Sequence, residues 1–265
     1  MTWIEALILG IVQGLTEFLP VSSSGHIVLG EALLHTGSAN NLAFTVVVHF
    51  ATVLSTLIVF RKTIWSILRG LRPEWNHSSR FVGHILISMI PVAFAGLFFK
   101  DEVEAPFQGR TMLVGFMLLI TGGLLLLTTR APNGNRNISP LKALLIGISQ
   151  ALAVIPGISR SGATISTALL LGVNREKAAE FSFLMVIPPI LGIMLLDLKD
   201  ITELSKACTL GISSTALVAG FIAAFLTGMA ACSWMISLVK KGRISHFAYY
   251  CFAIGIIAII ASWIG

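Results

Sequence analysis

Two stretches of this sequence decide its fold: QGLTEFLPVSSSGH at residues 13–26 and QALAVIPGISRSGAT at residues 150–164. Both begin with Gln-x-Leu, pass through a short apolar segment to a proline, and reach Ser-x-Ser-Gly. Proline lacks a backbone N–H and ends a helix that runs into it. A serine shortly after the proline accepts hydrogen bonds from the first N–H groups of the next helix. Each stretch therefore predicts a bend between two helices.

The composition places these bends in a membrane protein. Of the 265 residues, 55% are hydrophobic and 11% are charged, and the mean hydropathy is +0.90, whereas soluble domains carry about 25% charged residues. A helix that spans a membrane needs roughly 17–25 apolar residues, and six runs approach or exceed that length. They are Leu42–Phe60, Ile85–Phe99 (which needs its flanks), Met112–Thr129, Ala178–Leu196, Leu210–Val239 and Phe247–Ile264. We predict an all-α polytopic membrane protein with about six transmembrane helices.

The basic residues indicate orientation and not a nucleic-acid partner. The net charge is +6, but the lysines and arginines are scattered through the short loops between the apolar runs. In membrane proteins such loops follow the positive-inside rule. If the first run passes from outside to inside, most of the 18 lysines and arginines lie inside. We therefore expect no nucleic acid among the partners.

This orientation predicts two re-entrant hairpins. Residues 1–41 must begin and end outside, and residues 139–173 must begin and end inside, although both segments are apolar. Broken helices at membrane depth are tolerated where they are buried in protein or line a cavity. Each hairpin precedes three runs, so we interpret residues 1–265 as one membrane domain with inverted halves, 1–129 and 139–265. By itself such an inverted repeat favours a transporter.

The two bends have the chemistry of a phosphate site. Free N–H groups and the positive dipole end make a helix N-terminus favourable for an anion, and small residues let a ligand approach the backbone; here these are Gly25, Gly157 and Gly162. The Arg160 guanidinium would cost at least about 2.5–3.5 kcal/mol at the bilayer centre, and its planar fork suits phosphate. A structural ion pair with Glu17 is the alternative.

The first bend also carries groups that could cleave a phosphate bond. Gln13 and Glu17 are four residues apart and share one helix face. Glu17 could hold a divalent cation that bridges to phosphate, act as a base, or pair with Arg160. His26 could activate a hydroxyl nucleophile. Of the serines at 22–24 one would be the nucleophile, and the others would be caps or oxyanion donors.

At these motifs the chain resembles the bacterial undecaprenyl pyrophosphate phosphatase family, also called the bacitracin-resistance proteins. Residues 13–26, 156–164 and Glu180-Phe-Ser-Phe carry the likeness, which extends over the whole chain. The resemblance implies hydrolysis of undecaprenyl pyrophosphate to undecaprenyl phosphate and inorganic phosphate, which recycles the lipid carrier of cell-wall synthesis and gives bacitracin resistance. It also implies the cytoplasmic (inner) membrane, a site open to its outer, periplasmic face, and a divalent cation, Mg²⁺ or Ca²⁺. It assigns catalytic roles to Glu17, Ser23, His26 and Arg160.

Further residues of the bends are expected to contact the substrate, and Glu17 to contact the metal. The expected substrate contacts are Gln13, Ser22, Ser24, Gly25, Gly157, Ser159, Ser161, Gly162 and Thr164. The family often has an acidic residue where this chain has Gln13, so we expect a cation to rely on Glu17 and the substrate and not on two carboxylates.

One mechanism has Ser23 attack phosphorus while His26 takes its proton and Glu17 holds a cation or orients His26. In the other, water attacks directly with His26 or Glu17 as base. Two rival functions stay open, a transporter or flippase for polyprenyl phosphate and a noncatalytic scaffold. The sequence also leaves a homodimer open.

Overall fold

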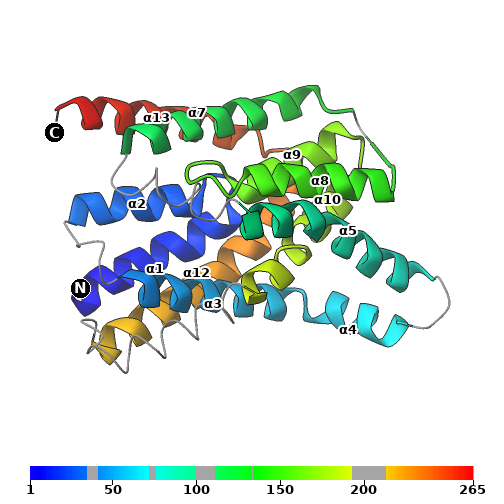
Figure 1. Cartoon of the computed structure of the whole chain (residues 1–265), viewed down its shortest axis with the longest axis horizontal. Helices are drawn as coiled ribbons and strands as arrows, with labels where there is room; N and C mark the ends of the chain where they lie inside the picture. Colours follow the sequence, from blue (N-terminus) through cyan, green and yellow to red (C-terminus); the bar gives the residue numbers. More distant parts are fainter. Residues whose placement is uncertain (35–40, 72–75, 99–110, 133, 193–212, 265) are drawn as a thin grey trace.

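The computed structural model describes residues 1–34, 41–71, 76–98, 111–132, 134–192 and 213–264, and within them the chain folds into helices (Figure 1). The named helices follow in chain order. They are α1 (Trp3–Phe18), α2 (Ser23–Leu34), α3 (Asn41–Val59), α4 (Arg61–Gly70), α5 (His77–Phe98), α7 (Thr111–Leu127), η2 (Thr128–Arg130), α8 (Pro140–Leu152), α9 (Arg160–Leu170), α10 (Arg175–Leu184), α12 (Ser214–Lys240) and α13 (His246–Ile264).

Within the described residues, four helices are each long and apolar enough to cross a membrane: α5, α7, α12 and α13. A fifth candidate consists of α3 and α4, which are bent by 69° relative to each other. The all-α, polytopic fold class is therefore confirmed. The second predicted run is longer than its apolar core suggested, because α5 begins at His77 and continues for 22 residues.

The fourth predicted run, Ala178–Leu196, is not one continuous helix in its described part. The helix α10 ends at Leu184, a turn follows at residues 185–186, and helix resumes at residues 187–192. Pro188 and Pro189 have no N–H to donate to the carbonyls four residues earlier, so the helix breaks one turn before them. Residues 193–196 of this run and 210–212 of the next lie outside the described part.

Both predicted hairpins are present as pairs of short helices. The helices α1 and α2 pack against each other, as do α8 and α9. At 13 residues, α8 is about 20 Å long at the α-helical rise of 1.5 Å per residue, which is less than the hydrocarbon core of about 30 Å. These lengths suit helices that enter a membrane and turn back. The division into inverted halves stays a prediction.

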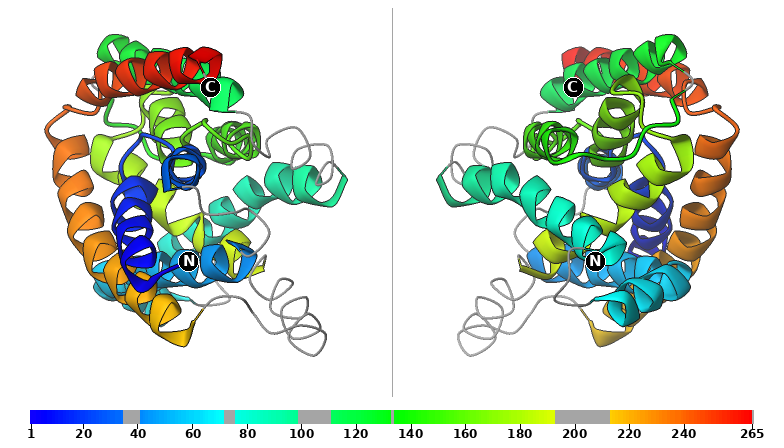
Figure 2. Two further views of the ribbon diagram at one scale, coloured as in Figure 1. Left: turned by 90° about the vertical axis from the view of Figure 1, so that its left-hand side faces the viewer. Right: turned by 90° about the vertical axis from the view of Figure 1, so that its right-hand side faces the viewer.

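Two helix pairs frame the hairpins, and each depends on a close approach at glycine. The helix α12 lies alongside α1 (Figure 2), where a Cβ on Gly10 would lie 2.4 Å from the Gly220 carbonyl oxygen. The helices α7 and α13 lie side by side (Figure 1), and a Cβ on Gly115 would lie 2.8 Å from the Gly255 carbonyl oxygen. Without a hydrophobic driving force between helices in lipid, such close backbone packing is a main source of association.

We predict that Gly10→Ala lowers the midpoint of thermal unfolding in detergent. Overpacking a close contact costs about 1–3 kcal/mol, because the added methyl meets α12 backbone that cannot move aside. Gly123→Ala is the matched control: Gly123 is also inside a helix, but a Cβ there meets nothing within 4 Å, so alanine should keep or raise the midpoint. Equal midpoints for the two variants would contradict the assigned contact between α1 and α12.

Candidate active site

The two bends are capped by the same pattern of serine hydrogen bonds. At the start of α2, Ser22 Oγ accepts from the Gly25 N–H at 3.3 Å and lies 3.4 Å from Ser24 Oγ. At the start of α9, Ser159 Oγ accepts from the Gly162 N–H at 3.1 Å and lies 3.3 Å from Ser161 Oγ. The predicted capping role of serine is therefore confirmed in both bends. They differ at the cap itself, since Ser22 has a φ of 70° and Ser159 a φ of −74°.

The two bends touch each other directly. Ser161 Oγ donates to the Leu19 carbonyl oxygen of the first bend at 3.2 Å. A Cβ on Gly25 would lie 3.2 Å from Gly157 Cα, and one on Gly162 would lie 3.3 Å from Pro20 Cβ. Gly157 also has a φ of +96°, a conformation that L side chains rarely adopt. The three glycines that we expected beside the substrate thus have a packing role, which brings the helix starts together; their contact with substrate stays a prediction.

Glu17 contacts most of the polar side chains that lie between the bends. Its carboxylate is 7% exposed and forms an ion pair with the Arg160 guanidinium through Oε1. The other oxygen, Oε2, accepts from Ser23 Oγ at 2.6 Å and from Gln13 Nε2 at 3.0 Å. His49 Nε2, on α3, lies 3.9 Å from Oε2.

This arrangement bears on the alternatives for Glu17 and Arg160. The ion pair that we considered for Arg160 is present, and it joins the first residue of α9 to the end of α1. The same carboxylate accepts a hydrogen bond from the Ser23 hydroxyl. Glu17 therefore lies within the hydrogen-bonding distance that a general base for Ser23 requires. Contact between Arg160 and phosphate stays a prediction.

His26 does not contact Ser23 in this structure, although the two are one helical turn apart. Its Nδ1 lies 2.8 Å from the Ser22 carbonyl oxygen, and its Nε2 lies 2.9 Å from Tyr250 Oη on α13. A carbonyl oxygen only accepts, so Nδ1 carries a hydrogen and Nε2 has the free lone pair of the neutral ring. The imidazole therefore presents an acceptor, but toward α13 and not toward the serine.

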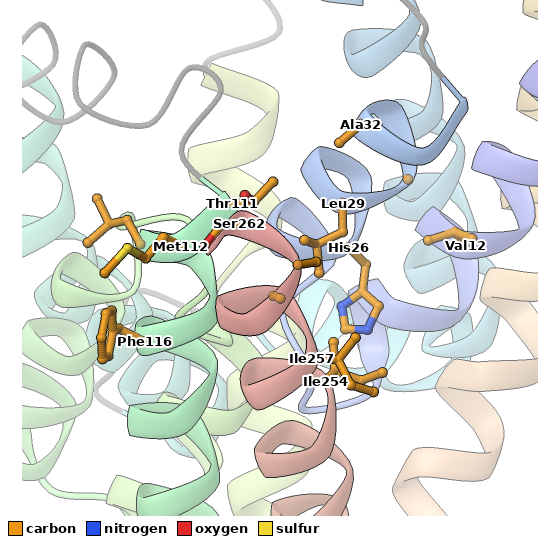
Figure 3. A pocket seen from close by; sticks show the side chains of 14 residues that line it. Val12, His26, Leu29, Ala32, Thr111, Met112, Phe116, Ile254, Ile257 and Ser262 are labelled. Carbon is orange, nitrogen blue, oxygen red and sulfur yellow. The ribbon is translucent and has the colours of Figure 1, made fainter. Parts of the chain in front are cut away.

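A large apolar groove lies on the His26 side of the bends (Figure 3). It has a volume of about 1060 Å³ and runs between α2, α7 and α13. Its wall is apolar except for His26, Thr111 and Ser262, which Figure 3 shows among Leu29, Met112, Phe116, Ile254 and Ile257. On the other side of the bends, Glu17 and Arg160 line a cavity of about 20 Å³, which is roughly the space of one water molecule.

Known proteins of similar sequence identify the family. The family model described as "Bacitracin resistance protein BacA" matches residues 6–257. A Bacteroides fragilis protein named undecaprenyl-diphosphatase is 54% identical over 264 residues, with 99% of each chain covered. Proteins of the same name from Christiangramia forsetii and Methanobrevibacter smithii are 52% and 37% identical, over 98–99% of each chain.

The chain belongs to the BacA family.

In this BacA-family chain, the remaining predicted residues have structural partners. Thr164 Oγ1 donates to the Arg160 carbonyl oxygen at 2.8 Å and also pairs with Ser182 Oγ. It thereby supports the helix that carries Arg160. Ser24 is exposed and is the outermost of the three serines, whereas Ser159 and Ser161 are buried.

Sequence reasoning missed the residues of α7 and α13 that hold the two bends of this BacA-family site. Thr121 Oγ1 donates to the Gly157 carbonyl oxygen and accepts from the Ser159 N–H, both at 3.0 Å. Cys251 Sγ donates to the Pro20 carbonyl oxygen at 3.6 Å, next to the Tyr250 contact with His26. Each lies singly in an apolar run, where its local sequence carries no signal of its partner.

The residues around Glu17 fit a cation that is held mainly by substrate. The described residues contain no group of three His, Cys, Asp or Glu side chains placed to bind a metal. Next to the Glu17 carboxylate, however, Gln13 Oε1 is buried without a hydrogen-bond partner. Mg²⁺ is often bound by one or two carboxylates and completed by substrate phosphates and water. One carboxylate and one free amide oxygen are compatible with such an ion.

We predict that Thr121→Val destabilises this BacA-family protein by about 2 kcal/mol or more, since two buried backbone groups lose their partner and each costs about 1–3 kcal/mol. The midpoint of thermal unfolding in detergent measures the loss. Thr129→Val is the control, because the exposed Thr129 hydroxyl bonds to the Leu126 carbonyl oxygen three residues earlier and its removal should leave the midpoint unchanged. A midpoint for Thr121→Val equal to that of the control would show that Thr121 does not hold the second bend.

Proposed function

We propose that this protein hydrolyses undecaprenyl pyrophosphate to undecaprenyl phosphate and inorganic phosphate within the membrane, which recycles the lipid carrier and gives resistance to bacitracin. Relatives that match the whole chain at up to 54% identity carry the name undecaprenyl-diphosphatase. The observation that carries the proposal is the meeting of the two family motifs, where Glu17 and Ser23 of one bend contact each other and Glu17 pairs with Arg160 of the other.

The terminal phosphate would bind between the two helix starts. The N-termini of α2 and α9 converge there, and their unpaired N–H groups and dipoles favour an anion. Arg160 would turn from Glu17 to the phosphate, because a guanidinium can hold two phosphate oxygens at once. Glu17 would then keep Ser23 on Oε2, and the Oε1 released by Arg160 would be free for a cation that enters with the substrate.

The first step would be attack of Ser23 Oγ on the terminal phosphorus. Glu17 Oε2, which lies 2.6 Å from Ser23 Oγ, would take the hydroxyl proton. The Oγ–P bond forms, the bridging P–O bond breaks, and undecaprenyl phosphate leaves. In the second step water attacks the phosphorus of the phosphoserine and the P–Oγ bond breaks; His26 Nε2 takes the proton of the water, and Glu17 returns its proton to Ser23 Oγ. The sum consumes one water and releases one inorganic phosphate and one proton.

A divalent cation, Mg²⁺ or Ca²⁺, is part of the proposal. Glu17 and the free Gln13 Oε1 would hold it together with the substrate. When bound, it would neutralise charge on the phosphates.

We infer that the protein lies in the cytoplasmic membrane, with the site open to the outer face. The distribution of basic loops supports this orientation. A homodimer stays a prediction.

The groove between α2, α7 and α13 would take the part of the polyprenyl chain next to the pyrophosphate. It is apolar, it reaches the bend at His26, and it is large enough for several isoprene units to lie along it. In a bilayer the chain leaves lipid to enter the groove, so burial adds little driving force. The groove would therefore act by placing the pyrophosphate at the bends.

We predict that the purified protein releases phosphate from undecaprenyl pyrophosphate in detergent, and that Ser23→Ala, Glu17→Gln and Arg160→Lys each slow release about a hundredfold or more, the scale of loss of acid–base or electrostatic groups. Ser233→Ala is the control for serine removal, since this exposed hydroxyl bonds within its own helix α12. Normal turnover in Ser23→Ala and Glu17→Gln would contradict the site. Lipid movement across vesicles without phosphate release by the unaltered protein would favour the flippase.

We predict that Ala261→Trp, which fills the groove, lowers kcat/KM for undecaprenyl pyrophosphate about tenfold or more, while kcat/KM for isopentenyl pyrophosphate changes little, because the loss lies in orientation of the long chain. Ile260→Trp is the matched control, since Ile260 is the adjacent exposed residue of α13 and does not line the groove. If the two tryptophan variants have the same kcat/KM for undecaprenyl pyrophosphate and the same kcat/KM for isopentenyl pyrophosphate, the groove does not place the chain.

A further inference from the structure

A tyrosine far from both motifs contacts the histidine of the first bend. Tyr250 is in the second turn of α13, and its hydroxyl lies 2.9 Å from His26 Nε2. The two rings are nearly parallel, with 10° between their planes and 5.6 Å between their centroids. The aromatic ring and the hydroxyl of Tyr250 thus both act on one imidazole.

The hydrogen bonds of His26 give the tyrosine hydroxyl a definite role. Nδ1 donates to the Ser22 carbonyl oxygen, so Nε2 of the neutral ring accepts, and the Tyr250 hydroxyl is the donor. The hydroxyl leaves the single lone pair of Nε2 when Nε2 takes a proton, and it then returns with its hydrogen turned away, as the acceptor of the new N–H. A phenol hydroxyl is both donor and acceptor. It can therefore pair with Nε2 before and after a proton transfer.

The position of Tyr250 is held by the packing of α13. Its neighbour Cys251 donates to the Pro20 carbonyl oxygen of the first bend. The helix α13 also packs against α7, where a Cβ on Gly122 would lie 2.7 Å from the Phe252 ring. Tyr250 therefore sits on a helix that is fixed both to the first bend and to the helix that carries Thr121.

The surroundings of His26 make this partner important. His26 lines the apolar groove, whose wall has few other polar groups. An imidazole nitrogen that turns toward an apolar wall without a partner loses a hydrogen bond that water would otherwise supply. In the structure Tyr250 supplies this bond.

We propose that Tyr250 is a positioning residue for His26: its hydroxyl and ring keep the imidazole in the tautomer whose Nε2 can exchange a proton, and hold the ring at the boundary between the bends and the groove. This inference rests on the proposed function, because it assigns His26 the proton transfer of the phosphatase reaction. Tyr250 acts through His26 and not on the phosphate.

The first experiment compares Tyr250→Phe with Tyr249→Phe in steady-state phosphate release. Phenylalanine keeps the ring and removes the hydroxyl. Tyr249, the preceding residue, is 67% exposed, and its variant should behave as the unaltered protein. Loss of a hydrogen bond to a group that becomes charged is worth about tenfold or more, so we expect kcat of Tyr250→Phe to fall about tenfold while KM and the thermal midpoint stay close to normal. Unchanged kcat, or a fall matched by Tyr249→Phe, overturns the proposal.

The second experiment does not depend on activity. Diethyl pyrocarbonate acylates an unprotonated imidazole nitrogen, and peptide mass spectrometry gives the rate at each histidine. The rate at His26 should rise several-fold in Tyr250→Phe, because Nε2 loses the covering hydroxyl, and the rate at the exposed His246 should not change. An equal rate at His26 in the two proteins overturns the proposal. If the unaltered protein releases no phosphate, the proposed function fails, and the labelling rates alone decide whether Tyr250 holds His26.

Discussion

The ion pair between Glu17 and Arg160 is the interaction on which the site depends. Each partner belongs to a different hairpin, and neither charge could stay in so apolar a place alone, because an unpaired buried charge costs several kcal/mol. The pair therefore requires both bends to meet, and the meeting of the bends in turn requires glycine at the closest contacts, Gly25, Gly157 and Gly162. In the proposed reaction it is also the contact that phosphate would displace, since a guanidinium that turned to phosphate would leave the carboxylate next to Ser23.

The helices α7 and α13 hold the two bends in place. They are packed together through glycines, and each holds one bend: Thr121 fixes the backbone of the second bend, and Cys251 and Tyr250 fix the first. The same two helices form most of the wall of the apolar groove. If the polyprenyl chain binds in the groove as proposed, one helix pair relates its place to that of the reacting groups, which is the relation that catalysis by orientation demands.

The site residues show which contacts can be predicted from local sequence patterns and which cannot. The caps at Ser22 and Ser159 could be predicted, because a serine after a proline bonds within three residues of itself. The hydrogen-bond partner of Ser23 could not, because Glu17 lies on the preceding helix and the turn between them sets their distance. In the structure Ser23 donates to Glu17 and does not contact His26. The contacts of Thr121 and Tyr250 could not be predicted at all. A single polar residue in an apolar helix does not indicate a partner that lies more than thirty residues away in the chain.

The sequence by itself determined the membrane class and the positions of both bends, because apolar run length, proline and serine act within a few residues; the set of reactive residues stays a prediction. Only the tertiary structure decided which reactive groups pair, which helices hold them and where the groove opens. Those features depend on contacts between helices, and in a bilayer such contacts follow from shape and hydrogen bonding, since apolar burial does not distinguish one helix face from another.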